Sequence, residues 1–97
     1  MELNYKGSFR RDYNAIANKE LIKSIKKKID EIKSAKSPLQ ISRLKKFRER
    51  KKVWYKIEIH TIQKRKIYWI LCIIRNETVE FRRLKPESYF KKRVMNA

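Results

Sequence analysis

The chain has 97 residues, enough for a single domain over residues 1–97 with one modest core, and its 41% hydrophobic content excludes a mainly disordered chain. A formal net charge of +18 exceeds what solubility needs, so we expect a phosphate-rich or acidic partner. One cysteine excludes an internal disulfide, and neither a leader pattern nor an apolar run long enough for a membrane helix is visible. We therefore expect a cytoplasmic protein.

Residues 2–6 predict a short strand, which the glycine at position 7 interrupts. Ser8 belongs to the residue types that cap helix N-termini, so we expect a short helix to begin there. Its apolar residues recur at the i, i+4 and i+7 spacing that places them on one face: Phe9, Tyr13 and Ile16. This face should pack into the core.

A longer helix is predicted from Asn18, a second capping residue, to about Ala35. Its apolar residues form one stripe: Leu21, Ile22, Ile25, Ile29 and Ile32. Lysines occupy the remaining faces, so we expect the stripe to pack inward and the lysines to face solvent. The Ser-Pro pair at positions 37 and 38 ends the helix.

Residues 41–52, "ISRLKKFRERKK", follow as a strongly basic stretch that we expect to be irregular or to form one or two helical turns. Its cations predict a phosphate-facing segment, and a plain solvated loop is an equally good interpretation. The basic residues are Arg43, Lys45, Lys46, Arg48, Arg50, Lys51 and Lys52. Residues 41–97 carry eighteen Lys or Arg against five Asp or Glu, so most of the excess charge lies in this half.

From residue 53 onward the pattern is that of a β-sheet. Residues 53–60 alternate between apolar and mixed positions, which predicts a strand with one buried face. After a basic turn, residues 66–74 are apolar at nearly every position, which indicates a central strand buried on both faces. Residues 75–77 predict a tight hairpin turn into a last strand over residues 78–84, which Pro86 stops.

These elements predict an α+β domain with two layers, in the order strand-helix-helix-strand-strand-strand. An antiparallel sheet of about four strands would carry the N-terminal helical hairpin on one face. The other face would present the charged members of each strand, and we expect the functional site there.

Several kinds of site are excluded by composition. One glycine cannot build a glycine-rich phosphate loop, and one cysteine with one histidine cannot form a zinc site. The lone His60 excludes a paired-histidine ribonuclease, and the scattered acidic residues give no two-metal cluster. We therefore expect neither a metal nor a small-molecule cofactor.

A cationic and aromatic set remains: Lys56, Arg65, Lys66, Arg82, Arg83 and Tyr89, with Trp54 and Trp69 nearby in sequence. Such a set suits RNA cleavage, because the 2′-hydroxyl of RNA can attack the adjacent phosphate without a metal. Arginine stabilises the extra charge on the phosphorus, a lysine crowded by other cations can act as a base, and tyrosine can donate a proton or stack on a base.

Other residues near this set have plainer interpretations. The two tryptophans are more typical of a core, and His60 is more typical of a surface. Glu58 can neutralise a cation on a neighbouring strand. Strand alternation allows only one of Arg82 and Arg83 on a given face unless a β-bulge intervenes.

The segments "LKKF", "WYKIEI", "RKIYWI" and "FRRLKPESYF", after a strand and a helical hairpin, resemble the RelE/ParE superfamily of bacterial toxins. The resemblance covers most of the chain. It implies a small α+β toxin that cuts mRNA on the ribosome and is wrapped by a cognate antitoxin, which we expect to contribute an acidic or amphipathic segment.

The resemblance also assigns roles to four residues of this chain. Lys56 would be the base or a phosphate ligand, and Lys66, or its neighbour Arg65, would bind the scissile phosphate. Arg83 would stabilise the transition state, and Tyr89 would stack on or protonate the substrate.

This chain departs from the family pattern at two positions, and it leaves other functions open. Glu58 stands where the pattern has a second lysine, and Lys66 where it has an arginine. The ParE branch of the superfamily poisons DNA gyrase and does not cleave RNA. A non-enzymatic gyrase inhibitor, or a basic RNA-binding module on the same fold, is therefore the alternative.

Overall fold

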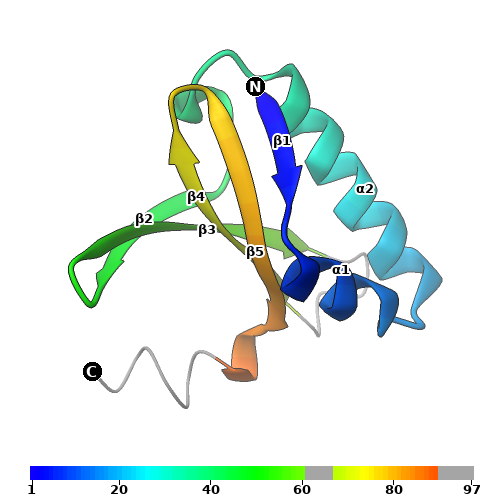
Figure 1. Cartoon of the computed structure of the whole chain (residues 1–97). Helices are drawn as coiled ribbons and strands as arrows, with labels where there is room; N and C mark the ends of the chain where they lie inside the picture. The colour runs from blue at the N-terminus through cyan, green and yellow to red at the C-terminus, as the bar shows by residue number, and fades with distance from the viewer. Residues whose placement is uncertain (61–66, 90–97) are drawn as a thin grey trace.

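The computed structural model describes residues 1–60 and 67–89, which form two helices packed on a five-stranded, mostly antiparallel sheet (Figure 1). The elements are β1 (Glu2–Tyr5), α1 (Gly7–Asn14), α2 (Lys19–Ser34), a 3-10 turn (Pro38–Gln40), β2 (Leu44–Glu49), β3 (Lys52–His60), β4 (Ile67–Arg75) and β5 (Thr78–Pro86). The strand order is β1-β5-β4-β3-β2, with β1 parallel to β5 and all other neighbours antiparallel. The predicted α+β class with an N-terminal helical layer is confirmed.

The two predicted helix caps have different outcomes. Asn18 caps α2 as predicted, since its Oδ1 accepts hydrogen bonds from the backbone N–H groups of Glu20 and Leu21 at 2.9 and 3.1 Å. The prediction for Ser8 is wrong. Because α1 already begins at Gly7, the Ser8 hydroxyl is free to donate to the carbonyl of Arg82 at 2.6 Å, which ties α1 to β5.

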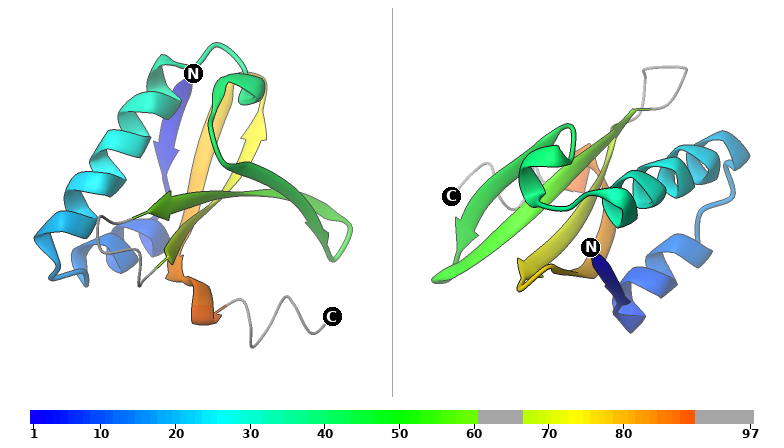
Figure 2. Two further views of the ribbon diagram at one scale, coloured as in Figure 1. Left: turned by 180° about the vertical axis from the view of Figure 1, so that it is seen from behind. Right: turned by 90° about the horizontal axis from the view of Figure 1, so that it is seen from above.

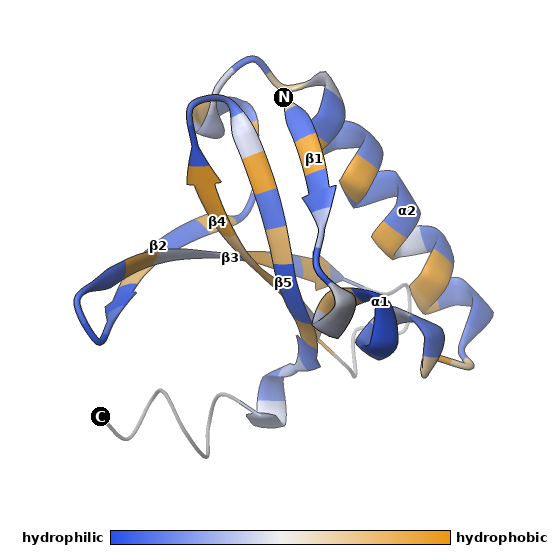
Figure 3. Cartoon of the chain, in the orientation of Figure 1, coloured by the Kyte–Doolittle hydropathy of each residue, from blue (hydrophilic) through white to orange (hydrophobic). Residues whose placement is uncertain are grey.

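The main core lies between α2 and the sheet. Figure 3 shows the apolar residues of α2 along the side that faces the sheet, as the predicted stripe requires. The helices and strands contribute these buried residues: Phe9, Leu21, Ile25, Ile32, Ile57, Ile59, Ile70, Cys72, Val79, Phe81 and Leu84. No helix in the described ranges is long and apolar enough to cross a membrane.

Strand β4 is the centre of the sheet and is buried on both faces, as its continuous apolar run predicts. Residues 69–73 are all buried. Ile70 and Cys72 belong to the main core, whereas Trp69 and Leu71 form a second cluster on the opposite face, with Phe47, Ile67 and Tyr89 against it. The sheet face away from α2, called the open face below, therefore has an apolar floor.

The expectation that residues 41–52 are irregular or helical is wrong, because most of them form β2 and its turn into β3. Leu44 of β2 lies opposite Ile57 and packs against the main core. Phe47 lies opposite Trp54, and their rings stack with centroids 6.5 Å apart. These contacts on alternate faces stabilise a strand in spite of its charges and add the fifth strand to the sheet.

Strand β5 follows the predicted turn and continues through Pro86, two residues beyond the predicted end. The turn residues Asn76 and Glu77 have φ angles of 47° and 66°, the combination that a tight hairpin needs. Within β5, Leu71 pairs with Arg83 but Cys72 pairs with Phe81, so Arg82 is the extra residue of a β-bulge. Arg65 of the predicted basic turn and Lys66, the first residue of the next predicted strand, lie outside the described residues, as does the tail from residue 90.

A basic face of the sheet as the candidate functional site

One row of the open face crosses four strands and contains two of the four predicted catalytic residues, Lys56 and Arg83. Lys45 of β2 lies opposite Lys56 of β3, Lys56 opposite Leu71 of β4, and Leu71 opposite Arg83 of β5. Since neighbouring strands lie about 4.8 Å apart, the Cα atoms of Lys56 and Arg83 are separated by roughly 10 Å. The sheet thus brings both residues to one face.

The ammonium groups of this row lie over aromatic rings. Trp69 is 4% exposed, and the Nζ atoms of Lys56 and Lys45 lie 4.6 and 5.6 Å from its ring centroid. Lys56 Nζ also lies 5.9 Å from the centroid of Phe47. Cation–π attraction holds the two lysines over the apolar floor. Trp69 is consequently a buried part of the floor, in agreement with its interpretation as a core residue.

The β-bulge turns both neighbouring arginines of β5 away from the main core. Arg82 Nε donates to Glu80 at 2.5 Å, and the Arg82 guanidinium lies 5.8 Å from the Trp54 ring centroid. Arg83 takes the position opposite Leu71 in the row. Both Arg82 and Arg83 can therefore point away from the main core, because the extra residue of the bulge interrupts the strand alternation.

Asp12 of α1 binds Arg83, the arginine that is predicted to be catalytic. Arg83 Nε donates to Asp12 Oδ2 at 2.9 Å, the Leu84 backbone N–H donates to the same oxygen at 3.0 Å, and Lys85 Nζ lies 3.4 Å from Oδ1. Although burial favours the neutral acid, the hydrogen bonds from Arg83 and Leu84 outweigh it and lower the pKa of Asp12. The same hydrogen bond raises the pKa of Arg83.

Helix α1 reaches this position because β1 covers only the first part of the β5 edge. The pairing of β1 with β5 ends at Phe81, and beyond it the carbonyl of Arg82 and the N–H of Leu84 bond to Ser8 and Asp12. Sequence reasoning missed Asp12. Its i+4 spacing from Ser8 places both side chains on one side of α1, which was the available signal.

Tyr89, another of the four predicted catalytic residues, packs against the cluster of Trp69 and Leu71. Lys85 Nζ lies 5.4 Å from its ring centroid. Lys56, Arg83 and Tyr89 therefore surround one apolar floor, at the end of the sheet where α1 meets β5. Lys66 and Arg65, one of which is predicted to bind the scissile phosphate, lie outside the described residues.

The predicted RNA-binding set of β2 and its turn is divided among different surfaces. Lys45 belongs to the open face, whereas Lys46 and Arg48 alternate onto the opposite side of β2. Arg50 and Lys51 form the turn, and Lys52 begins β3 opposite Glu49. These cations surround a hairpin and do not line a single groove.

A second polar cluster lies beside the C-terminal half of β3. Glu58 Oε1 lies 3.1 Å from His60 Nε2, and Glu58 Oε2 lies 3.4 Å from Arg43 Nη1. Partial burial opposes ionisation, but the hydrogen bonds from His60 and Arg43 lower the pKa of Glu58. The glutamate thus neutralises Arg43, which lies just before β2 and not on a neighbouring strand as expected. With lysines of α2 the cluster lines a cavity of about 500 Å³.

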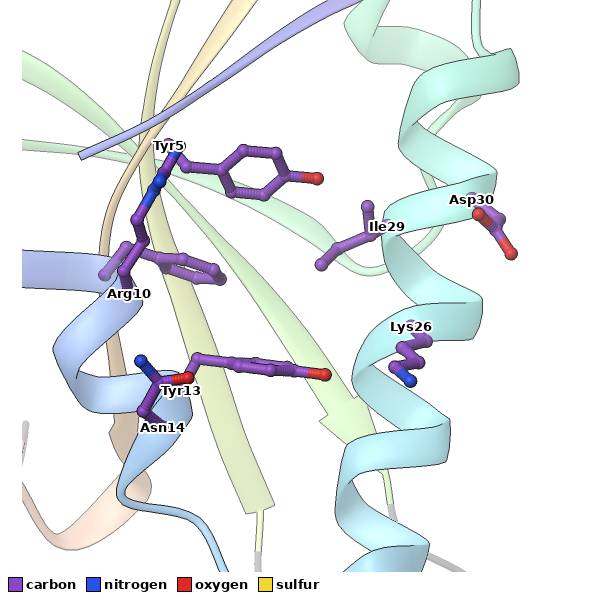
Figure 4. Close-up of a pocket in the computed structure, with 8 residues that line it drawn as sticks. Tyr5, Arg10, Tyr13, Asn14, Lys26, Ile29 and Asp30 are labelled. Atoms are coloured by element: carbon purple, nitrogen blue, oxygen red, sulfur yellow. The ribbon is translucent and has the colours of Figure 1, made fainter. Parts of the chain in front are cut away.

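A cavity of about 540 Å³ separates α1 from α2 (Figure 4). Tyr5 and Tyr13 extend from β1 and α1 toward α2, where Ile29 lies opposite them. Arg10, Lys26 and Asp30 contribute charges to its lining. The cavity is thus aromatic and apolar inside, with a mixed charged rim, and it contains none of the predicted catalytic residues.

Among the described residues, the open face offers cations, aromatic rings, the Tyr89 hydroxyl and the carboxylate of Glu80, which is paired with Arg82. Within residues 1–60 and 67–89, no three His, Cys, Asp or Glu side chains gather closely enough to hold a metal ion. Arg83 keeps its Nη1 group without a partner in the described part of the chain, so it can bind a phosphate oxygen while Asp12 holds Nε.

Comparisons with protein-family models, with curated proteins and with solved structures found no match for this chain. The fold and the site geometry therefore describe a small α+β domain with a basic, aromatic sheet face.

Proposed function

We propose that the protein is a toxin of the RelE/ParE kind, which cleaves mRNA on the ribosome in the cytoplasm and needs no metal. The observation that carries this proposal is the position of Lys56, Arg83 and Tyr89 around one apolar floor on a strongly basic face. These are three of the four positions to which the sequence resemblance assigns catalytic roles. The net charge of +18 supports a partner made largely of phosphate.

The proposed reaction uses the substrate's own 2′-oxygen as the nucleophile. The 2′-oxygen attacks the adjacent phosphorus, its proton passes to a base, and the bond from phosphorus to the 5′-oxygen breaks. Lys56 acts as the base in its neutral amine form, or as a phosphate ligand in its ammonium form, and Arg83 stabilises the charge on the phosphorane. Tyr89 protonates the leaving 5′-oxygen or stacks on a base, so the products are a 2′,3′-cyclic phosphate and a 5′-hydroxyl.

A translation extract with a defined mRNA tests the proposal. The protein should cut the mRNA in the presence of EDTA and leave cyclic phosphate ends. Arg83→Ala should reduce the cleavage rate by about a hundredfold or more, as the loss of a transition-state donor does in other enzymes.

The matched control is Arg75→Ala, which removes one exposed arginine at the far end of β4 and should cleave at the wild-type rate. Intact mRNA in the presence of translating ribosomes would contradict the proposal. Inhibition of gyrase supercoiling without RNA cleavage would favour the ParE-like alternative.

A basic RNA-binding module that does not cleave is the second candidate, and the ion pair of Arg83 with Asp12 favours it. A guanidinium already bound to a carboxylate has less charge to offer a phosphorane, and Glu58 replaces one of the expected lysines. If this candidate is right, RNA binds but stays intact, and Arg83→Ala weakens binding only slightly.

A cognate antitoxin with an acidic or amphipathic segment is the proposed protein partner. The excess positive charge supports an acidic partner, and the cavity between α1 and α2 could receive apolar side chains of such a segment (Figure 4). Co-expression of the product of a neighbouring reading frame should relieve the growth arrest that the protein causes alone. Growth arrest that no neighbouring product relieves would contradict this pairing.

A further inference from the structure

The hairpin of β2 and β3 projects beyond the rest of the sheet. Pairing of β3 with β4 begins only at Tyr55, opposite Cys72, whereas β2 and β3 pair as far as Glu49 and Lys52. Both views in Figure 2 show this hairpin extending away from α1 and α2. Residues 45–54, called the arm below, therefore end in a two-stranded ribbon that has no third strand beside it.

The arm concentrates unpaired positive charge on all of its sides. It carries six cations and one acid, and the cations are Lys45, Lys46, Arg48, Arg50, Lys51 and Lys52. Lys45 faces the open side and Arg48 the opposite side, while Arg50 and Lys51 form the tip. Within the described residues, no ion pair is formed by any cation of the arm from residue 46 to residue 52. The arm can therefore approach phosphates on two sides at once.

The tip has a backbone conformation that its two residue types, Arg and Lys, disfavour. Arg50 and Lys51 have φ angles of 51° and 65°, in the left-handed region where two-residue hairpin turns usually have Asn-Gly. Non-glycine residues are strained in this region. Arg50 and Lys51 occupy turn positions where uncharged residues such as Asn and Gly would give a more stable turn. This indicates that the positive charge at the tip serves a function.

We propose that the arm binds double-helical RNA, lying across the wide and shallow minor groove so that cations on its two sides contact the phosphates of both strands. The inference rests on the proposed function for the choice of RNA. A single strand on the open face would meet only one side of the arm, whereas a groove has two phosphate walls. The arm also leads directly to Lys56, so a bound duplex would place an adjoining single strand at the candidate site.

The test measures binding of the full chain to a fluorescein-labelled RNA hairpin by anisotropy over a series of salt concentrations. The triple variant R48A/R50A/K51A should weaken binding about tenfold or more, and should lower the slope of log K against log salt by about two to three. A single-stranded RNA of equal length should bind more weakly to the wild type and lose less in the variant.

The matched control is the triple variant K19A/K23A/K33A. It removes the same charge from exposed positions of α2, away from the arm (Figure 1). Its affinity for the RNA hairpin should stay within about twofold of wild type, because these lysines should contact no phosphate. An equal loss in both triple variants would show that net charge alone governs binding and would overturn the inference.

A second variant separates binding from folding. R50N/K51G gives the turn its preferred residues, so the melting temperature should rise while the affinity for the RNA hairpin falls. Wild-type affinity in this variant, or equally tight binding to a B-form DNA duplex, whose major groove also admits a β-ribbon, would overturn the inference.

These outcomes are distinct from those of the proposed function. If the wild type cleaves no RNA but its duplex binding depends on the arm, only the proposed nuclease activity fails. If cleavage depends on Arg83 but the arm variants bind duplex RNA as the wild type does, only the role of the arm fails.

Discussion

At the scale of single residues, Asp12 affects both the stability of the fold and the charge of the candidate site. Its side chain is only 10% exposed, and its carboxylate accepts hydrogen bonds from Arg83 and from the Leu84 backbone. Charge-assisted bonds of this kind contribute about 1.5–3 kcal/mol each, so the contact stabilises α1 against β5. The same contact reduces the positive charge that Arg83 presents to a substrate.

Protonation of Asp12 should therefore destabilise the protein in acid. Its pKa is lowered in the folded state, so its contribution is complete above the unfolded value of 3.8 and is lost as the pH falls through the lower folded value. Urea unfolding at a series of pH values should show this fall, and Asp12→Asn should make it shallower. Glu31, Glu58 and Glu80, whose pKa values are also lowered, cause the remainder. An unchanged pH profile in Asp12→Asn would contradict the assignment.

The same substitution should change RNA binding in the opposite direction from stability. Asp12→Asn keeps an acceptor for the Leu84 N–H but removes a negative charge beside Arg83 and Lys85. We expect a loss of about 1–2 kcal/mol in the free energy of unfolding and a gain of about fivefold in RNA affinity, from ~1 kcal/mol of removed repulsion. Thermal melts and anisotropy measure the two effects, and a parallel loss in both would argue against a site at Arg83.

The Cys72 thiol should be unreactive in the folded protein. It lies in the main core, and burial raises the pKa of its thiol to about 12, so almost no thiolate forms at neutral pH. Its reaction with a thiol reagent should follow the global unfolding rate and accelerate in urea. Fast modification in native buffer would show that β4 opens locally.

At the scale of elements, the sequence predicts those features that depend on local pattern. The Asn18 cap, the apolar stripe of α2 and the continuous run of β4 each contain their own signal, and each is confirmed. Strand β2 carries a weak signal, because Arg50 and Lys51 replace the usual turn residues and charges obscure its alternation. The role of Ser8 was misread for a different reason, since it depends on a β5 edge that only the folded sheet defines.

The bulge at Arg82 is another feature that sequence alone could not place, and it makes a prediction of its own. Deleting Arg82 leaves Phe81 facing the core, Arg83 facing the open side and Leu84 facing the core, so alternation is intact. We expect this variant to fold with a loss of about 1–2 kcal/mol, from the Ser8 hydrogen bond and the contact with Trp54.

The matched control deletes Glu80 instead. Without a bulge elsewhere, that deletion moves Phe81, which is fully buried, to the open face. Loss of a buried phenylalanine costs about 3–5 kcal/mol, so this variant should unfold or melt far lower. Circular dichroism melts compare the two deletions, and equal melting temperatures would contradict the register of β5 against β4.

At the scale of the whole molecule, a net charge of +18 on one small domain opposes its own compact state. Several of its carboxylates lie in ion pairs: Asp12 with Arg83, Glu58 with Arg43, and Glu80 with Lys6. Long-range repulsion among the remaining lysines and arginines is screened by salt. A polyanionic partner would relieve this repulsion in the same way and would bind more tightly for that reason.

Salt should therefore stabilise the protein alone while weakening its complex with RNA. Raising NaCl from about 20 mM to about 300 mM shortens the screening length from roughly 20 Å to below 8 Å, so the melting temperature of the free protein should rise. Over the same range the RNA affinity should fall steeply, because each counterion released from the RNA gains less entropy in a more concentrated salt solution. Differential scanning calorimetry and anisotropy separate the two trends, and a melting temperature that falls with salt would contradict the first.

The way α1 closes the edge of β5 has a consequence for self-association. Beyond Phe81, Ser8 and Asp12 occupy backbone groups of β5 that another strand could otherwise use. Displacement of α1 would therefore open a site for strand addition and release Arg83 from its carboxylate in one movement. A partner that inserted a strand there would pair with the β5 edge and contact Arg83 at the same time. Two copies in which α1 is displaced would be prone to associate through their β5 edges.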